Sequence, residues 1–407
     1  MEMKHVEGGV CAAKGFKAWG AFGGLGDPKA DKDDMALVLS ECPGAAAAVY
    51  TSNKVKAAHI LVDKKHLENG VAQAMLCNSV NANTCNADGE ERAIANAELV
   101  AKETGISAED VIVTSTGVIG KPMPGEPFEK GIPELVKGLS ADGGDKAAHA
   151  IMTTDTLDKQ TAVTFMAGGK ECTLGGMAKG SGMIHINMGT MLCFMTTDCA
   201  ITAQMLQRAL DFEVKDSFNQ VSIDGDTSTN DTLSIIANGM AGNSVINGEG
   251  EDFDNFKAAL HEVSVTFAKK IAGDGEGCTK LIEAHVVNAP TKDTARLISK
   301  NIICSSLFKA AMFGNDANWG RVLCAIGYTP ADFETDDIDV TISSAKGSVD
   351  VCDGSASMPF DEEKALEILK EDEVTVDVDI NDGESEAYAW GCDLTYDYVK
   401  INGEYRS

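Results

Sequence analysis

Short apolar runs separated by glycine fill the first 120 residues, and this pattern predicts the strands of a sheet. Each run is only a few residues long and ends close to a turn-forming residue. The predicted strands of this region are Met35–Leu39, Ala45–Thr51, Ala58–Val62 and Ala74–Cys77. The apolar face of such a sheet packs against another element, either a second sheet or helices.

Helical periodicity supplies that second element through the middle of the chain. Apolar residues recur at three- and four-residue spacing between charged residues, and Gly105 ends the first of these segments. The predicted helices are Gly89–Gly105, Glu129–Leu139, Lys146–Met152, Gln204–Val214, Phe253–Ile271 and Thr294–Phe313. Between them, Thr161–Met166 and Glu171–Leu174 alternate on both sides of Gly168-Gly169, which predicts a β-hairpin.

The C-terminal third has a strand and helix pattern of its own. A strand over Leu281–Val287 precedes it, and we place a domain boundary near Pro290, dividing the chain into 1–289 and 290–407. The elements expected beyond it are strands at Val340–Ser343, Gly347–Val351, Glu373–Ile380 and Glu386–Trp390, with a helix at Asp361–Leu369. The fold class predicted for the whole chain is α/β (α+β).

Charge and apolar patterning narrow the classes of function. The chain has 63 acidic against 34 basic residues, a net charge of −29, so its average surface repels nucleic acid and anionic membranes. No apolar run reaches the roughly 20 residues that a spanning helix needs. The first residues lack the apolar core of a signal peptide, so we expect a cytoplasmic protein. The cysteines and histidines show no zinc-site spacing, and we expect no metal.

A glycine-rich stretch, Gly175–Gly189, leads directly into Thr190 and an apolar run. A threonine hydroxyl is a weak nucleophile unless a base lies beside it, and an N-terminal threonine can use its own α-amine as that base. Cleavage of the chain before Thr190 would create such a terminus, and Gly189 permits the strained backbone that cleavage requires. A threonine in a buried strand is more often structural, and the spacing alone leaves both interpretations open.

Three further runs could serve a site. Thr114–Gly120 ends a predicted strand with hydroxyls and N–H groups suited to an oxyanion hole, although a plain turn has the same sequence character. Glu276 lies between two glycines in a run that does not have P-loop order, and it could hold an amine. Asp224–Thr232 could be a metal loop, but without EF-hand spacing it is better explained as a hydrogen-bonded support.

Together, in this order, these runs resemble the ornithine acetyltransferase (glutamate N-acetyltransferase) family of arginine biosynthesis. The resemblance covers essentially the whole chain. The runs that carry it are Lys14–Ala18, Asn78–Asn83, Ser115–Gly120, Met152–Thr156, Lys179–Ile184, Asn187–Leu192, Asp224–Asp231, Gly275–Lys280, Phe313–Arg321 and Tyr398–Asn402. Several positions depart from the usual pattern: Gly189 stands where alanine is common, His185-Ile186 where Ala-Pro is common, Val80 where glycine is common, and Ser407 where threonine is common.

The resemblance implies a chain that cleaves itself between Gly189 and Thr190, with Thr190 as the nucleophile and Thr116 and Gly117 as the oxyanion hole. The substrate contacts that it implies are Thr153, Lys179, Thr190, Glu276, Asn402 and Ser407. It also implies an α-β-β-α sandwich of the N-terminal-nucleophile kind, formed by both cleaved chains, with a smaller C-terminal α/β domain that completes the substrate site.

The activity that the resemblance implies is acetyl transfer from N-acetylornithine to glutamate by a ping-pong mechanism, without a cofactor. The assembly that it suggests is a heterotetramer of two α and two β chains. Whether acetyl-coenzyme A is a second donor stays open. Two other functions remain: an N-terminal-threonine aminopeptidase or amidase, in which water replaces glutamate, and an uncleaved amino-acid-binding protein without activity.

Overall fold

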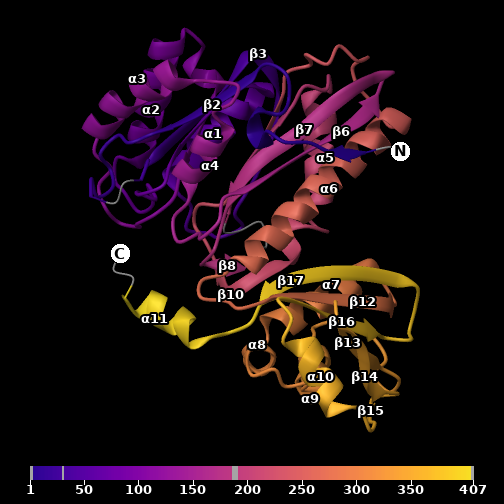
Figure 1. The fold of residues 1–407 in the computed structure, drawn as a ribbon. Coiled ribbons are helices and arrows are strands. Elements are labelled where there is room, and N and C mark those ends of the chain that lie inside the picture. The colour runs from indigo at the N-terminus through magenta and orange to yellow at the C-terminus, as the bar shows by residue number, and fades with distance from the viewer. Residues whose placement is uncertain (1–2, 30–31, 186–190, 405–407) are drawn as a thin grey trace.

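The computed structural model describes residues 3–29, 32–185 and 191–404. Two sheets and the helices around them form two lobes, one above the other in Figure 1. The upper lobe is built mainly from the first half of the chain and the lower lobe mainly from the second. Among the described residues, no helix is both long enough and apolar enough to cross a bilayer.

The first sheet has nine strands in the described part of the chain. Its order is β1 (Lys4–His5), β6 (Lys159–Ala167), β7 (Lys170–Lys179), β9 (Leu192–Thr197), β11 (Thr232–Ala237), β3 (Met35–Tyr50), β4 (Val71–Asn78) and β5 (Val111–Ser115), and β2 (Phe16–Ala21) pairs with β3. The β9–β11 and β4–β5 pairs are parallel. β6 and β7 form the predicted hairpin.

The second sheet has eight strands among the described residues. Their order is β15 (Ala356–Ser357), β14 (Gly347–Asp353), β13 (Asp339–Ser344), β16 (Glu373–Asp379), β12 (Leu281–Ala289), β17 (Ser385–Cys392), β10 (Val221–Thr227) and β8 (Ile184–His185). β12 precedes Pro290 yet lies between β16 and β17, which follow it. The second sheet therefore takes strands from both sides of the division that the sequence suggested.

Eleven α-helices cover the two sheets in the described structure. They are α1 (Ala58–His66), α2 (Gly89–Thr104), α3 (Glu126–Gly138), α4 (Gly144–Ile151), α5 (Ala203–Glu213), α6 (Glu251–Gly273), α7 (Lys292–Cys304), α8 (Ser306–Phe313), α9 (Trp319–Gly327), α10 (Glu362–Leu369) and α11 (Tyr396–Glu404). α6 contacts β6 and β7 of the first sheet and β10, β12 and β17 of the second, so it lies between the sheets. The predicted mixed α/β class is confirmed.

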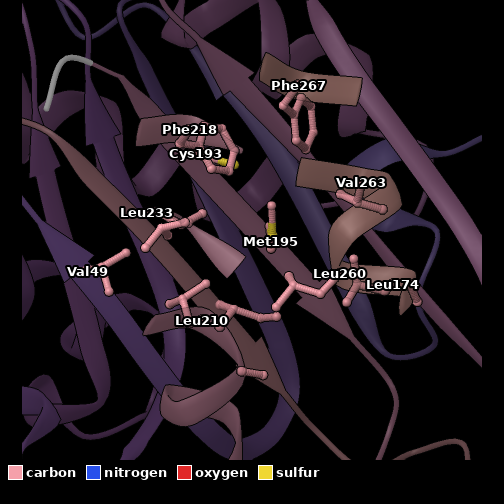
Figure 2. Packing of buried hydrophobic residues seen from close by; sticks show 14 of the residues in the cluster. Val49, Leu174, Cys193, Met195, Leu210, Phe218, Leu233, Leu260, Val263 and Phe267 are labelled. Atoms are coloured by element: carbon pink, nitrogen blue, oxygen red, sulfur yellow. The ribbon is translucent and has the colours of Figure 1, made fainter. Parts of the chain in front are cut away.

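The largest hydrophobic cluster lies between the first sheet and helices α5 and α6, as Figure 2 shows. β9 is buried on both faces: Cys193 and Met195 face this cluster, whereas Leu192 and Phe194 pack into the cluster on the other face. Each large apolar side chain buried in this way contributes roughly 1.5–3 kcal/mol to folding. The strand that follows Thr190 is therefore fixed at the centre of the sheet.

Three predictions differ from the structure. Met35–Leu39 and Ala45–Thr51 were predicted as two strands but correspond to one strand, β3, whose register with β4 shifts between Leu39 and Gly44. Ala58–Val62 is the first part of helix α1 and not a strand, because a short apolar run with no clear alternation fits a buried helix equally well. The helix predicted over Thr294–Phe313 is broken at Ser305, which leaves the helical conformation. The Ser305 hydroxyl accepts a hydrogen bond from Phe308 N at 3.3 Å and so caps α8.

Candidate active site

A pocket of about 140 Å³ brings together six of the residues that the resemblance assigned to the site. They come from distant parts of the chain: Thr116, Gly117, Thr153, Lys179, Glu276 and Asn402. The remaining predicted residues, Gly189, Thr190 and Ser407, lie outside the described residues. The described chain resumes at Met191, and Leu192 pairs with Lys179 across β7 and β9.

The turn after β5 presents two hydrogen-bond donors to the pocket. Thr116 N–H donates to Asn78 O at 2.9 Å, whereas the Thr116 hydroxyl and Gly117 N–H have no partner among the described residues. Gly117 has φ +123°, and a Cβ there would lie 2.2 Å from Val80 O. Only glycine fits this position, because another side chain would meet both an unfavourable φ and a backbone atom.

The loop between β10 and β11 supports this turn from behind. The Asn230 side chain is buried and donates to Ser115 O at 2.7 Å and to Ala82 O at 2.6 Å. Its Oδ1 accepts from the Thr84 hydroxyl at 2.9 Å. Asp224, in strand β10 ahead of the loop, accepts from the backbone N–H of Met183 at 2.6 Å. The interpretation of Asp224–Thr232 as a hydrogen-bonded support is thus confirmed.

Glu276 places one carboxylate on the opposite wall. Its side chain is 9 % exposed, and its Oε2 accepts from Asn402 Nδ2 at 2.7 Å. Gly182 makes room for it, since a Cβ at residue 182 would lie 2.3 Å from the Glu276 carboxyl carbon. Asn402 belongs to α11, which extends from the lower lobe toward the upper one in Figure 1. The loop between α6 and β12 and the C-terminal helix α11 therefore complete the pocket.

Lys179 supplies the positive charge, and a buried carboxylate lies behind it. Asp155 Oδ2 is 3.8 Å from Lys179 Nζ, and Asp155 Oδ1 accepts from Gly180 N at 2.6 Å. Burial by itself would raise the pKa of Asp155, but Lys179 and Lys159 hold that pKa well below its usual range. Asp155 is therefore ionised at neutral pH, and it keeps a negative charge next to Lys179.

His185 is not among the residues that line the pocket. Its Nδ1 lies 3.1 Å from Ser222 Oγ and 3.5 Å from Cys304 Sγ. Burial, with Lys300 nearby, lowers the pKa of His185 to about 4. The ring is thus neutral at pH 7 and is directed at other side chains.

Several residues of the site were not singled out in the sequence. Asp155 is part of the run Met152–Thr156, and Asp274 lies two residues before Glu276, so position along the chain was a usable signal for both. Gly182 is part of the run Lys179–Ile184 and had the same signal, whereas Lys159 gave none, because its partner Asp274 comes from a distant segment. Among residues 3–29, 32–185 and 191–404, no group of histidine, cysteine, aspartate or glutamate could hold a metal ion.

Comparison with protein families matches residues 20–407, nearly the whole chain, to the ArgJ family. The chain belongs to the ArgJ family. A curated ArgJ-family relative, the arginine biosynthesis bifunctional protein ArgJ of Caldanaerobacter subterraneus subsp. tengcongensis, is 49 % identical over 100 % of both chains. The bifunctional protein ArgJ 1 of Clostridium acetobutylicum is 48 % identical over 96 % of each. The family resemblance drawn from the sequence is thus confirmed.

A solved ArgJ structure supports the same assignment. The crystal structure of the arginine biosynthesis bifunctional protein ArgJ of Bacillus halodurans is 42 % identical, with a TM-score of 0.50. The match covers 98 % of that chain but 52 % of this one. The solved polypeptide is therefore only a little over half as long as this ArgJ chain.

Proposed function

We infer that the protein is a glutamate N-acetyltransferase of arginine biosynthesis, which moves an acetyl group from N2-acetylornithine to glutamate. Family membership over the whole chain supports this function. The observation that carries it to particular residues is that Glu276, Lys179, Thr116 and Gly117, which offer a carboxylate, an ammonium group and two hydrogen-bond donors, line one pocket. An acetylated amino acid offers the complementary groups: an amine or carboxylate at its ends and a carbonyl between them.

The proposed mechanism has two half-reactions. Thr190 Oγ attacks the acetyl carbonyl while its own α-amine accepts the hydroxyl proton. Thr116 and Gly117 donate to the oxyanion of the tetrahedral intermediate. The bond from the carbonyl carbon to nitrogen then breaks, the leaving amine takes the proton, and ornithine departs. The amine of glutamate attacks the acetyl-threonine and restores the Thr190 hydroxyl. These steps use only side chains and the two amino acids, so the reaction needs no cofactor.

The charges of the pocket assign the ends of the substrate. Glu276 holds the cationic side-chain amine of ornithine, and Asn402 fixes the orientation of that carboxylate. Lys179 meets the α-carboxylate or orients the nucleophile. Thr153, which also lines the pocket, contacts the substrate, and Ser407 contributes a hydroxyl. A charge-assisted contact in a buried pocket is worth roughly 1.5–3 kcal/mol, enough to select a charged donor.

Cleavage between Gly189 and Thr190 is part of the proposal. It is supported by the length of the Bacillus halodurans chain, since a polypeptide of about half this chain is what such a cut produces. We propose that residues 1–189 and 190–407 stay together and that two such pairs form a heterotetramer in the cytoplasm. Gel electrophoresis under denaturing conditions should show two bands, and N-terminal sequencing of the second should begin Thr-Met-Leu-Cys-Phe.

An acetyl-transfer assay tests the function. Purified protein is given N-acetylornithine or acetyl-coenzyme A as donor, with glutamate or water as acceptor, and N-acetylglutamate is measured. We expect N-acetylglutamate from N-acetylornithine, and the second donor shows whether the enzyme is bifunctional. Release of acetate without N-acetylglutamate would identify an amidase. Ornithine binding by an uncleaved, inactive chain would identify a binding protein.

A further inference from the structure

A buried cluster of opposite charges adjoins the pocket through Lys179. Lys159 is 1 % exposed, and its Nζ lies 2.8 Å from Asp155 Oδ1 and 2.5 Å from Asp274 Oδ2. With Lys179 on the far side of Asp155, two cations and two anions form one buried cluster. Lys159 and Asp274 do not line the 140 Å³ pocket, and the proposed mechanism uses neither of them.

Each carboxylate of this cluster holds the backbone that carries a charge of the pocket. Asp155 accepts from the N–H of Thr153 at 3.0 Å and from that of Gly180, the residue after Lys179. Through these bonds it fixes the segment that ends in Lys179. Its position in turn depends on the ammonium group of Lys159.

Asp274 holds the segment that ends in Glu276 in a similar way. Its carboxylate accepts from Thr156 N at 3.1 Å, and its carbonyl accepts from the Ser181 hydroxyl at 2.7 Å. Ser181 O then accepts from Glu276 N at 2.9 Å. The segment that ends in Glu276 is therefore tied to Lys159 through Asp274 and to the Lys179 segment through Ser181.

We propose that Lys159 is a positioning residue that sets the places of the Lys179 ammonium group and the Glu276 carboxylate in the pocket. Without the Lys159 charge, Asp155 and Asp274 would share Lys179 as their remaining cation in this cluster. Lys179 would move toward Asp155, and the Asp274 segment would lose the contact that holds Glu276 in place. A misplacement of about 1 Å can reduce catalysis by roughly 10²-fold.

Two variants and a matched control test this role, which rests on the proposed function. Lys159→Met removes the charge at similar length, and Asp274→Asn keeps the shape of the second carboxylate. Arg296→Met is the control, because Arg296 lies in helix α7 and does not line the pocket. This change removes the two hydrogen bonds that Arg296 Nε and Nη2 donate to the Asp216 carboxylate at 2.9 and 2.8 Å. For each protein, melting temperature, ornithine affinity by calorimetry and kcat/KM for N-acetylornithine and uncharged N-acetylnorvaline are measured.

We expect Lys159→Met to lower kcat/KM for N-acetylornithine by about 10²-fold and to affect N-acetylnorvaline about tenfold less, because the charge-recognising contact is the one displaced. Asp274→Asn should act in the same direction, and it carries the test if Lys159→Met does not fold. Arg296→Met should lower the melting temperature and leave the ratio of the two donors unchanged.

Equal losses for both donors in the Lys159 and Asp274 variants would overturn the proposal, since that is the effect of a merely structural cluster. Failure of the proposed function gives a different result, namely a wild-type protein that transfers no acetyl group from N-acetylornithine. Ornithine affinity then decides the role of Lys159: an affinity about tenfold weaker in Lys159→Met supports it, and an unchanged affinity refutes it.

Discussion

Gly182→Ala should displace the Glu276 carboxylate without much change in the stability of the fold. The added Cβ would lie 2.3 Å from the carboxyl carbon and 2.4 Å from both oxygens, whereas ordinary contacts begin at 3.4 Å. The carboxylate must therefore withdraw by about 1 Å. It is the mobile end of a flexible side chain, and Gly182 has no positive φ, so the free energy of unfolding should change by about 1 kcal/mol or less.

The expected effect on catalysis is much larger. A displacement of about 1 Å at the contact that recognises the donor should lower kcat/KM for N-acetylornithine by roughly 10²-fold. Steady-state kinetics and urea denaturation measure the two quantities on the same protein. Gly248→Ala is the matched control, because a Cβ there meets no atom within 4 Å, and it should change neither.

A double-mutant cycle shows whether Gly182 acts through Glu276. If it does, Gly182→Ala should cost much less in a Glu276→Gln background than in the wild type, because the contact that it displaces is already weakened. An undiminished loss in that background would refute the reasoning. Wild-type kinetics in the single variant would refute it as well.

Three further outcomes follow from residues of the site and the core. Thr190→Ala should leave the chain uncut and inactive on a denaturing gel, whereas Thr190→Ser should retain some cleavage and transfer, and normal cutting of the alanine variant would place the nucleophile elsewhere. Glu276→Gln should lower kcat/KM for N-acetylornithine by about one to two orders of magnitude and spare self-cleavage, and an equal loss with N-acetylnorvaline would exclude charge pairing. Burial lowers the pKa of His59 from 6.5 to about 3, so below pH 6.5 the unfolded chain binds a proton that the folded chain does not. His59 should therefore cost about 2 kcal/mol of stability by pH 5. In urea denaturation His59→Phe should lose less stability than wild type between pH 7 and 5, and equal losses in the two proteins would contradict this.

Sequence patterns predicted the elements whose periodicity is strong. α6 and the β6–β7 hairpin agree with the predictions to within a few residues, because long amphipathic runs and a glycine turn each favour one structure. α1 was missed because its short apolar run suits a buried helix as well as a strand. The place of β12 in the second sheet could not be read from the chain, since pairing partners far apart in sequence leave no periodic signal.

For the site as well, some residues could be predicted from the sequence and others could not. Family resemblance identified six residues that line the pocket, but it gave no sign of what holds them there. Lys159 looks like any lysine in a strand until Asp155 and Asp274 are seen on either side of it. Asn230 looks like a loop residue until its bonds to Ser115 and Ala82 are seen. Such support depends on the meeting of segments that only the folded chain brings together.

The order of strands in the first sheet also determines whether folding or the proposed cleavage comes first. β9 and β11 follow the proposed cut, yet they lie between β7 on one side and β3 on the other, both of which precede it. Both parts of a chain cut before Thr190 would thus contribute strands to the same sheet. Separating them would require two central strands, β9 and β11, to leave the core. For the proposed cut, folding therefore has to precede cleavage. Of the nine strands described in the first sheet, a separate 1–189 chain would lack two and a separate 190–407 chain would lack the other seven. The first sheet would thus form while the chain is still intact. After the proposed cut, the two polypeptides could exchange partners only by unfolding.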